Sequence, residues 1–229
     1  QTCGIPDEIS HRPTWKIGIE QLKRTMAQGL RFDYVTFDEE YGKVPEFIFE
    51  LDSIGQKAIG EVPANFRVWV KKPACKSHRA EHASHRVDKT ASHSPAFYGQ
   101  SWRKMVIKNT TRGRCVWHIK SAQVYLVEHK DSKAYCPVPT DRTYRLIVAH
   151  NRQTDEIKYF VSNAPAKEKL EVLLDVAFSR WHVEKWFEHA KQECGFGAFE
   201  VRTYTSLIRH WLASRLAMYF LAEQTARLR

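Results

Sequence analysis

The stretch "FDYVTFDEEYGKVPEFIFELDSIGQKAIGEVPANFRVWV", residues 32–70, decides the fold class. Residues 34–37 form a short run of strand-forming side chains that ends at Asp38. Residues 45–55 have the pattern of a short helix, and residues 58–70 that of a strand with an irregular middle. This alternation predicts an α/β fold with Asp38 at the carboxyl end of a strand.

Working outward, residues 14–28 carry apolar side chains at helical intervals and predict an amphipathic helix. Residues 71–100 are basic, His-rich and poor in large aliphatic side chains, so we expect a surface excursion that is partly mobile. Residues 102–163 group β-branched and aromatic residues between turn signals, which predicts an antiparallel meander. Residues 166–193 and 204–226 predict two long helices. The whole order predicts an α/β core interrupted by a β-rich insert.

The chain is strongly basic. Its 229 residues include 36 Lys and Arg against 26 Asp and Glu, which gives a formal net charge of +10. Such a balance favours polyanionic partners, nucleic acid first, although net charge says nothing about the fold. The hydrophobic share of 43% is enough for a packed core and excludes a disordered tail.

The five cysteines are scattered, and none belongs to a Cys-x-x-Cys pair. This pattern argues against a disulfide framework and favours a reducing cytoplasm. No apolar run approaches the length of a membrane span, and the first residues lack the layout of a secretion signal, so we expect no membrane partner. Because the chain begins at Gln1 rather than Met, we also expect an N-terminal portion to precede it.

A carboxylate lies at an unexpected place in "RWHVEKWFEHAKQECG", residues 180–195. Glu184 and Glu188 continue, at helical spacing, an apolar stripe formed by Leu170, Leu173, Leu174, Ala177 and Trp181. A buried carboxylate is costly unless it is paired or binds a metal. One interpretation is an ordinary ion-pair network of the two glutamates with Arg180 and Lys191 on a half-solvated helix. The other is one arm of a divalent-metal site, in which the two cations contact phosphate or brace the carboxylate.

Arg180, Glu184 and Lys191 match the R-x3-E-x6-K part of the Y-x2-R-x3-E-x6-K signature found in a branch of bacterial insertion-sequence transposases with a DDE catalytic triad. Residues 32–70 resemble that branch's second-aspartate region, in which a Tyr-Gly pair follows the Asp. The segment at residues 195–221 resembles its closing segment. Three separated segments agree in order, so the resemblance covers most of the chain; it is weakest in the basic, His-rich stretch.

The resemblance implies a ribonuclease-H-like fold, a mixed sheet with flanking helices, interrupted by an antiparallel β-rich insertion. Asp38 would be the second catalytic carboxylate and Glu184 the third, and both would be metal ligands. Two Mg²⁺ or Mn²⁺ ions, roughly 3.5 to 4 Å apart, would activate a water or a 3′-hydroxyl for attack on a DNA phosphate. This function would bring the two carboxylates within about 4 to 8 Å of each other.

Two departures from the family pattern matter. The signature's Tyr falls at Ala177, with the aromatic Phe178 one place later, so the role of that Tyr at a DNA end is absent or filled differently. Only Asp7 and Asp33 precede Asp38, with too little chain between for the strands that such a core places between its first two carboxylates. We therefore expect the N-terminal strands, with the first carboxylate, to lie upstream, and the chain to be inactive alone.

Other interpretations stay open. Asp38 by itself is typical of a residue that caps the following turn. The basic stretch contains zinc-like spacings at Cys75, His78, His82, His85 and His93. So hydrophilic a stretch nevertheless favours a flexible loop that faces DNA.

The first hairpin of the predicted insert combines cations with an aromatic side chain: Trp102, Arg103, Lys104, Lys108, Arg112 and Arg114. A solvated strand face and a contact surface for the DNA backbone explain this pattern comparably well.

These observations divide the chain into a partial catalytic core at 1–70, a basic loop with the β-rich insertion at 71–165, and helices that complete the core at 166–229. The expected protein is a fragment of a bacterial DNA transposase, cytoplasmic and nucleoid-associated on DNA, whose complete form cleaves and transfers the strands of a mobile element. Its partners would be the element ends and the target DNA, and a homodimer on DNA is left open. The alternatives are a non-enzymatic DNA-binding or domesticated remnant, and a nuclease of the same fold without strand transfer.

Overall fold

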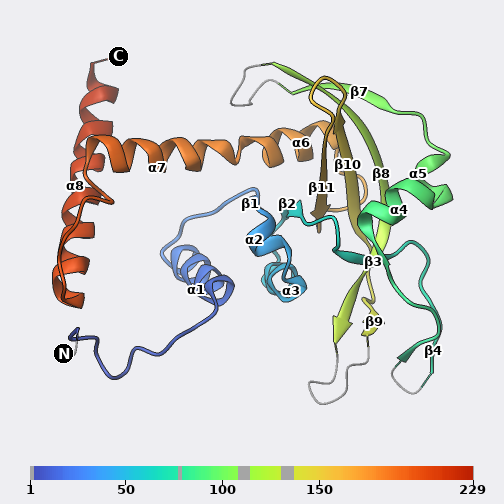
Figure 1. Ribbon diagram of the computed structural model, residues 1–229, viewed down its shortest axis with the longest axis horizontal. Helices are drawn as coiled ribbons and strands as arrows, with labels where there is room; N and C mark the ends of the chain where they lie inside the picture. Colours follow the sequence, from blue (N-terminus) through green and yellow to red (C-terminus); the bar gives the residue numbers. More distant parts are fainter. Residues whose placement is uncertain (1–2, 77–78, 108–113, 130–136, 229) are drawn as a thin grey trace. The chain divides into compact units, whose positions relative to one another are not determined.

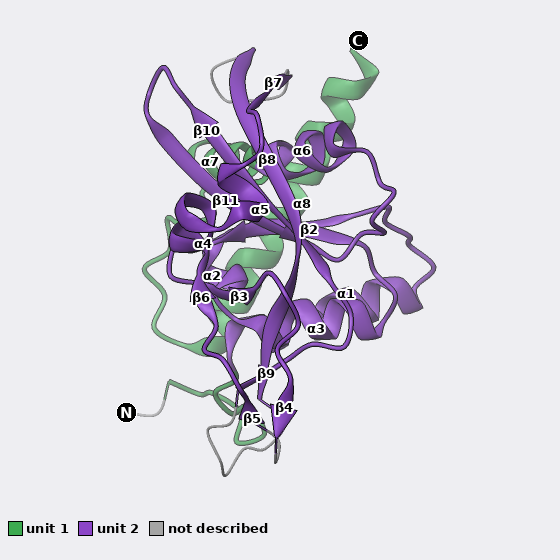
Figure 2. Cartoon of the chain, turned by 90° about the vertical axis from the view of Figure 1, so that its right-hand side faces the viewer, with its two compact units in different colours: residues 1–12, 181–229 green, residues 13–180 purple. Residues whose placement is uncertain are grey.

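The structure is a computed structural model that describes residues 3–76, 79–107, 114–129 and 137–228. The chain divides into two compact units, residues 13–180 and residues 1–12 with 181–229. Figure 2 colours these units separately, and each is described here by itself.

The unit of residues 13–180 is a mixture of strands and helices (Figure 1). Its helices are α1 (Thr14–Ala27), α2 (Glu39–Gly42), α3 (Pro45–Ser53), α4 (Val87–His93), α5 (Pro95–Tyr98) and α6 (Leu170–Ser179). Its strands are β1 (Val35–Phe37), β2 (Ala58–Val62), β3 (Arg67–Trp69), β4 (Cys75–Lys76), β5 (Arg79–Ala80), β6 (His85–Arg86), β7 (Arg103–Ile107), β8 (Cys115–His129), β9 (Pro137–Pro139), β10 (Tyr144–Asn151) and β11 (Glu156–Ser162).

One mixed sheet of nine strands organises this unit. Its order is β1-β2-β11-β10-β8-β3-β6, and β7 and β9 also pair with β8. β1 runs parallel to β2, with Val35 opposite Ala58, whereas β11 runs antiparallel to β2, with Val161 opposite Gly60. The antiparallel meander predicted for residues 102–163 is confirmed, and its strands continue the same sheet as β1 and β2.

Alternating side chains along the strands supply two cores, one on each face of the sheet. Leu146 and Val148 of β10 belong to the core that also contains buried side chains of α1, α3, α4 and α5. Ile147 and Ala149, their neighbours along the strand, belong to the core on which α6 packs. The sheet is therefore a central layer with helices on both faces.

Several predicted elements agree with the structure. The helices expected at 14–28 and 45–55 are α1 and α3. The strand expected to end at Asp38 is β1, and the strand expected at 58–70 is divided into β2 and β3 around the irregular stretch. These elements were predictable because their apolar periodicity is local to the sequence.

Residues 71–100 differ from the expected surface excursion. The described part of this stretch contains α4 and α5, and it buries Val87 and Phe97 completely. Both side chains join the core on the α1 face of the sheet. Burial of Val87 and Phe97 thus stabilises an ordered structure in a segment whose overall composition is hydrophilic.

The unit of residues 1–12 and 181–229 holds α7 (Trp181–Glu193) and α8 (Tyr204–Arg227). The helix expected at 204–226 agrees with α8, whereas the helix expected at 166–193 is divided at Arg180 into α6 and α7. No described helix is both long enough and apolar enough to cross a membrane.

The turn between α7 and α8 is fixed by contacts within this unit. Gly195 has a φ of 60°, a left-handed conformation that favours glycine. Its carbonyl oxygen accepts a hydrogen bond from Nε2 of His210 at 2.8 Å. The ring of Phe196 stacks on that of Trp211 with centroids 6.1 Å apart, so the turn and α8 share an aromatic cluster.

Candidate active site

Asp38 is positioned by the parallel strand pair and by the helix that follows it. It directly follows β1 and is the N-cap residue of α2. Its Oδ1 accepts hydrogen bonds from the backbone N–H groups of Glu40 at 3.1 Å and Tyr41 at 3.4 Å. The capping role considered for Asp38 is thus real. It coexists with a position at the carboxyl end of a parallel strand, where α/β sheets bind ligands.

Two glycines allow the close packing that sets this turn. A Cβ added to Gly42 would lie 1.9 Å from the carbonyl oxygen of Glu61 in β2. A Cβ added to Gly60 would lie 2.1 Å from the ring of Phe37 in β1. Both distances are impossible for a real side chain, so α2 and Phe37 lie against β2 only because glycine stands at each point. The glycine of the Tyr-Gly pair after Asp38 therefore has a structural cause.

The guanidinium of Arg180 faces the second oxygen of the same carboxylate. Arg180 is the C-cap residue of α6, and its Nη1 lies 3.9 Å from Oδ2 of Asp38. The two side chains are 26% and 44% exposed, so water screens the attraction. Such a pair contributes at most about 1 kcal/mol to stability. Its main consequence is positional, because it joins the end of α6 to the end of β1.

Glu184 lies on an exposed part of its helix, as in the half-solvated interpretation of this segment. The apolar stripe is buried only along α6, at Leu173, Leu174 and Ala177, and Glu184 is exposed on α7. The cost of desolvation therefore does not explain why this residue is a carboxylate. Asp38 and Glu184 lie in different units of the chain, and their convergence stays a prediction.

The other charged residues of α7 are also exposed. Glu188 pairs with Lys185 at 2.6 Å, and this hydrogen bond lowers the pKa of the Glu188 carboxyl group. The partner of Glu188 is thus a residue that the expected ion-pair network did not include. Lys191 is exposed, and its predicted contact with phosphate remains untested.

The aromatic residue near the signature's missing Tyr has a packing role. Phe178 packs against Trp117 and Phe160, with ring centroids 4.9 and 5.6 Å apart, in the core beneath α6. Ala177 beside it is buried. Neither side chain is free to act at a DNA end in this arrangement.

Some of the predicted DNA-contact residues are bonded to or packed against other side chains. Trp102 packs against His150 and Lys120, whose Nζ lies 4.6 Å from the ring centroid, and Arg103 is bonded to Glu171 of α6. Arg103, Lys104 and Arg114 are exposed, whereas Lys108 and Arg112 lie outside the described residues.

A hard cation needs several oxygen ligands, and Asp38 is one suitable donor because its carboxylate is half exposed at a strand end. Within the described residues, no three His, Cys, Asp or Glu side chains are grouped so that they could hold a metal ion. This also applies to the described members of the zinc-like set; His78 falls outside the description. Asp38 is therefore a single candidate ligand and does not form a group of three such ligands with the other described residues.

Sequence reasoning missed the pair of Arg180 with Asp38 and the two glycine contacts. The only local signal for the pair was the signature that contains Arg180, and the signal for Gly42 was its place four residues after Asp38. The pair of Arg180 with Asp38 joins segments that are far apart in the sequence, and the two glycine contacts depend on how β2 packs.

Comparison with known proteins adds an independent finding. The model of the family described as DDE superfamily endonuclease matches residues 1–123, which include Asp38, its capped turn and the paired strands β1 and β2. No curated protein matches the chain. The matched span is more than half of the 229 residues, and the chain therefore belongs to the family of DDE superfamily endonucleases.

Proposed function

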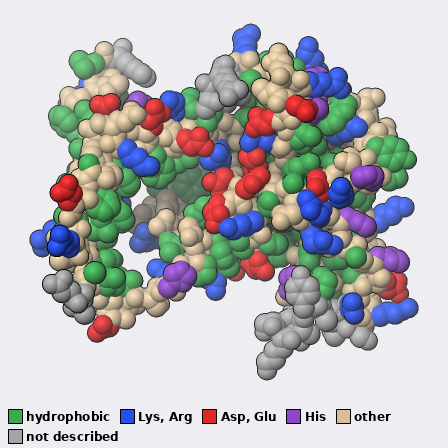
Figure 3. All heavy atoms as spheres, viewed as in Figure 1, with side chains coloured by type: hydrophobic (Ala, Val, Ile, Leu, Met, Phe, Trp, Pro, Cys, Tyr) green, Lys and Arg blue, Asp and Glu red, His purple; other side chains and the backbone are tan. Residues whose placement is uncertain are grey.

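We propose that the chain is part of a DNA transposase that cleaves and transfers the strands of a mobile element. The observation that carries the proposal is the position of Asp38, a half-exposed carboxylate at the carboxyl end of a parallel strand beside Arg180. It lies within the span that matches the endonuclease family. Acidic side chains gather around α2 on the face drawn in Figure 3, which would attract divalent cations.

In this proposal Asp38 and Glu184 are the metal ligands. Glu184 follows Arg180 by four residues, on the helix α7 that begins at Trp181. The meeting of Glu184 with Asp38 is part of the proposal and rests on the R-x3-E-x6-K spacing of Arg180, Glu184 and Lys191. A bound Mg²⁺ or Mn²⁺ ion would supply Lewis acidity at the DNA phosphate.

The surrounding residues would orient the carboxylate. The two backbone N–H groups hold Oδ1 of Asp38, and Arg180 lies beside Oδ2. Arg180 would thus orient the second carboxylate oxygen of Asp38 away from the turn. Lys191 and the exposed Lys104 and Arg114 would contact the DNA backbone, which fits the net charge of +10.

The first carboxylate would come from a strand upstream of the present residues. β1 ends the strand order of the sheet and pairs with β2 alone among the described strands. A further strand could pair along the other edge of β1 and bring its own carboxylate beside Asp38. The N–H of Val35 already donates to the carbonyl oxygen of Lys57 at 2.9 Å, so along β1 the N–H of Thr36 points to the other edge. In an upstream-extended chain, the amide proton of Thr36 should then exchange more slowly than in the present chain.

The deciding experiment is cleavage of DNA that carries the element ends by the upstream-extended chain with Mg²⁺. Asp38→Asn and Glu184→Gln should each abolish cleavage and leave DNA binding unchanged. The matched controls are Glu39→Gln, an exposed neighbour in the same turn, and Glu188→Gln, one helical turn after Glu184; both should cleave normally.

The same experiment separates the alternatives. A DNA-binding remnant would bind DNA and never cleave it, whatever upstream residues were restored. A nuclease would cleave but would not join the released 3′-ends to a target duplex. A cytoplasmic location in a bacterium and a homodimer on DNA belong to the proposal and rest on the family resemblance.

A further inference from the structure

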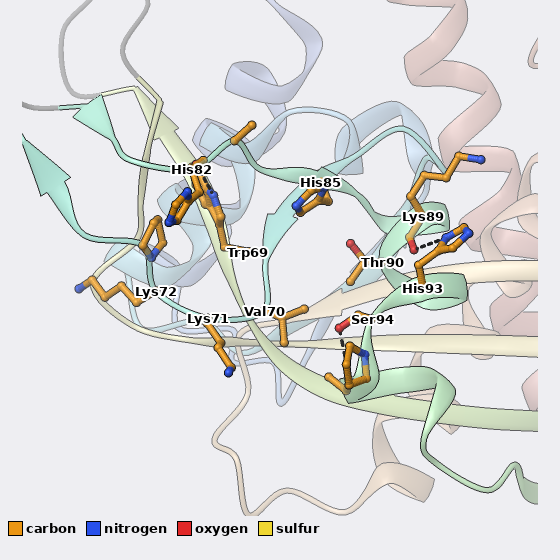
Figure 4. A pocket seen from close by; sticks show the side chains of 14 residues that line it. Trp69, Val70, Lys71, Lys72, His82, His85, Lys89, Thr90, His93 and Ser94 are labelled. Carbon is orange, nitrogen blue, oxygen red and sulfur yellow. Dashed lines mark hydrogen bonds between the residues drawn. The ribbon is translucent and has the colours of Figure 1, made fainter.

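A large pocket lies within the unit of residues 13–180, distant in sequence from Asp38. Its volume is about 1050 Å³, and it is formed by the end of β3, the residues around β6, helix α4 and the start of α5 (Figure 4). A pocket of this size can hold a ligand of one or more nucleotides.

The charged groups around the pocket share one sign. Among its 14 lining residues there is no Asp or Glu, while six are basic or imidazole side chains: Lys71, Lys72, Lys89, His82, His85 and His93. Figure 3 shows Lys, Arg and His side chains gathered over the region where Figure 1 places α4 and β3. A pocket with such a rim should attract anions.

Part of this positive charge is not neutralised by nearby carboxylates. Lys72 pairs with Asp141 at 3.2 Å, and the Asp88 carboxylate is bound by Arg86 at 2.7 Å. Neither Lys71 nor Lys89 forms a salt bridge among the described ion pairs, and both are exposed; the charge of Lys89 is partly offset by the neighbouring Asp88. These two lysines are therefore available to an anionic ligand.

The walls of the pocket are mainly apolar. Trp69 lines it with Val70, Pro95 and Ala96. The indole N–H of Trp69 already donates to the carbonyl oxygen of His82 at 3.0 Å. Trp69 is 4% exposed, so its ring forms part of the apolar floor of the pocket. A ligand that matches this pocket combines a flat apolar part with negative charge.

A buried hydroxyl group in the pocket lacks a partner. Thr90 is 4% exposed, and its Oγ1 makes no hydrogen bond. Thr90 lines the pocket, and Figure 4 shows its side chain directed from α4 toward the side on which His85 and Val70 lie. Buried polar groups are normally satisfied, and an orphaned one inside a pocket marks a contact for a ligand.

We propose that this pocket binds an unpaired nucleotide of a DNA strand, with the base against the wall formed by Trp69 and Val70 and hydrogen-bonded by Thr90. The adjacent phosphates would contact Lys71 and Lys89. An unpaired nucleotide presents both a base face and a phosphate, whereas duplex DNA presents mainly its phosphates and keeps its base faces stacked. The inference rests on the proposed function only in taking DNA as the ligand.

The test is binding of a fluorescent oligothymidylate of about ten nucleotides, without metal, compared with a blunt duplex of equal length. The single strand should bind at least about tenfold more tightly than the duplex. The double variant Lys71→Ala, Lys89→Ala should weaken single-strand binding about tenfold and reduce the salt slope by about 1.4, which corresponds to two phosphates. The charge-matched control is Lys16→Ala with Lys167→Ala, outside the pocket, which should change the affinity little.

Thr90→Val tests the hydroxyl group separately from charge. Valine has the same shape without the unpartnered oxygen, so the variant should keep its melting temperature and lose several-fold affinity for the single strand. A photoreactive 4-thiothymidine in the oligonucleotide should crosslink to the segment of residues 69–96.

Equal binding of strand and duplex, equal losses in the two lysine pairs, or crosslinks confined to other segments would each overturn the proposal. Binding of a free mononucleotide as tightly as the strand would also overturn it and assign the pocket to a small ligand. Because no cleavage is measured, failure of the transposase proposal in its own assay leaves this result independent.

Discussion

Arg180 holds its guanidinium 3.9 Å from the carboxylate of Asp38, so the last residue of the larger unit lies at the carboxyl end of its only parallel strand pair among the described strands. This pair links the two segments that the sequence signature had connected only by analogy. It also gives the Arg of that signature a defined neighbour.

Arg180→Ala should therefore separate activity from stability. The free energy of unfolding should change by no more than about 1 kcal/mol, because both side chains are substantially exposed. Cleavage by the upstream-extended chain should fall by about tenfold or more, because Asp38 loses the cation that orients it. Urea unfolding and a cleavage assay measure the two effects. Lys23→Ala, which removes another exposed pair, with Glu50 at 3.0 Å, should leave cleavage unchanged.

Gly42→Ala should destabilise the fold near the candidate site. The new methyl group would meet the carbonyl oxygen of Glu61 at 1.9 Å, so α2 must shift away from β2. Overpacking of this kind costs about 1 to 3 kcal/mol, which urea unfolding can measure. Gly197→Ala is the control, since the nearest atom to its added Cβ is a flexible Lys191 carbon at 3.7 Å. Equal stability of the two variants would contradict the packing argument.

The sequence was sufficient where a signal is local. Residues 34–37 predicted β1 and the position of Asp38, and the alternation along residues 144–162 predicted two strands of the sheet. Period-two and helical patterns identify which side chains share a face. They do not say what covers that face.

The predictions that differ from the structure do so because a sequence pattern does not show which elements cover a face. The apolar stripe is continuous in the sequence from α6 to α7. Its side chains are buried in the core of the sheet only along α6, and Glu184 on α7 is exposed. Helices α4 and α5 were missed because their stability comes from burying Val87 and Phe97 in a core built by distant strands. Tertiary contacts decided both outcomes.

Asn163→Ala should be among the more destabilising single changes in the larger unit. The side chain of Asn163 is buried; its Oδ1 accepts from the N–H of Ala58 at 2.7 Å and its Nδ2 donates to the carbonyl of Gln56 at 2.9 Å. Removing it leaves two buried backbone groups unpaired at the start of β2. Each such group costs about 1 to 3 kcal/mol, so we expect a loss in this range or above it by urea unfolding.

Asn151→Ala provides a comparison for that variant. Asn151 is also buried, but its side chain is described with one bond, from the N–H of Gln153 at 3.0 Å. The loss should therefore be smaller than for Asn163→Ala. The reverse order would show that the bonds to β2 are not what makes Asn163 important.

His118 should make the stability of the sheet depend on pH. Burial lowers the pKa of its imidazole, and the positive charges of Arg152, His150 and Lys104 lower it further. The unfolded chain keeps a pKa of about 6.5, so between the two values it binds more protons than the folded chain does. The free energy of unfolding should then decrease as the pH falls through about 6.5 and level off below the folded-state pKa.

His118→Gln should reduce this dependence in urea unfolding between about pH 5 and 8, whereas the exposed His11→Gln should not. An unchanged slope in His118→Gln would assign the dependence to other groups. A direct NMR titration of the His118 ring would then have to show an ordinary pKa, because a depressed value without a stability slope contradicts the linkage.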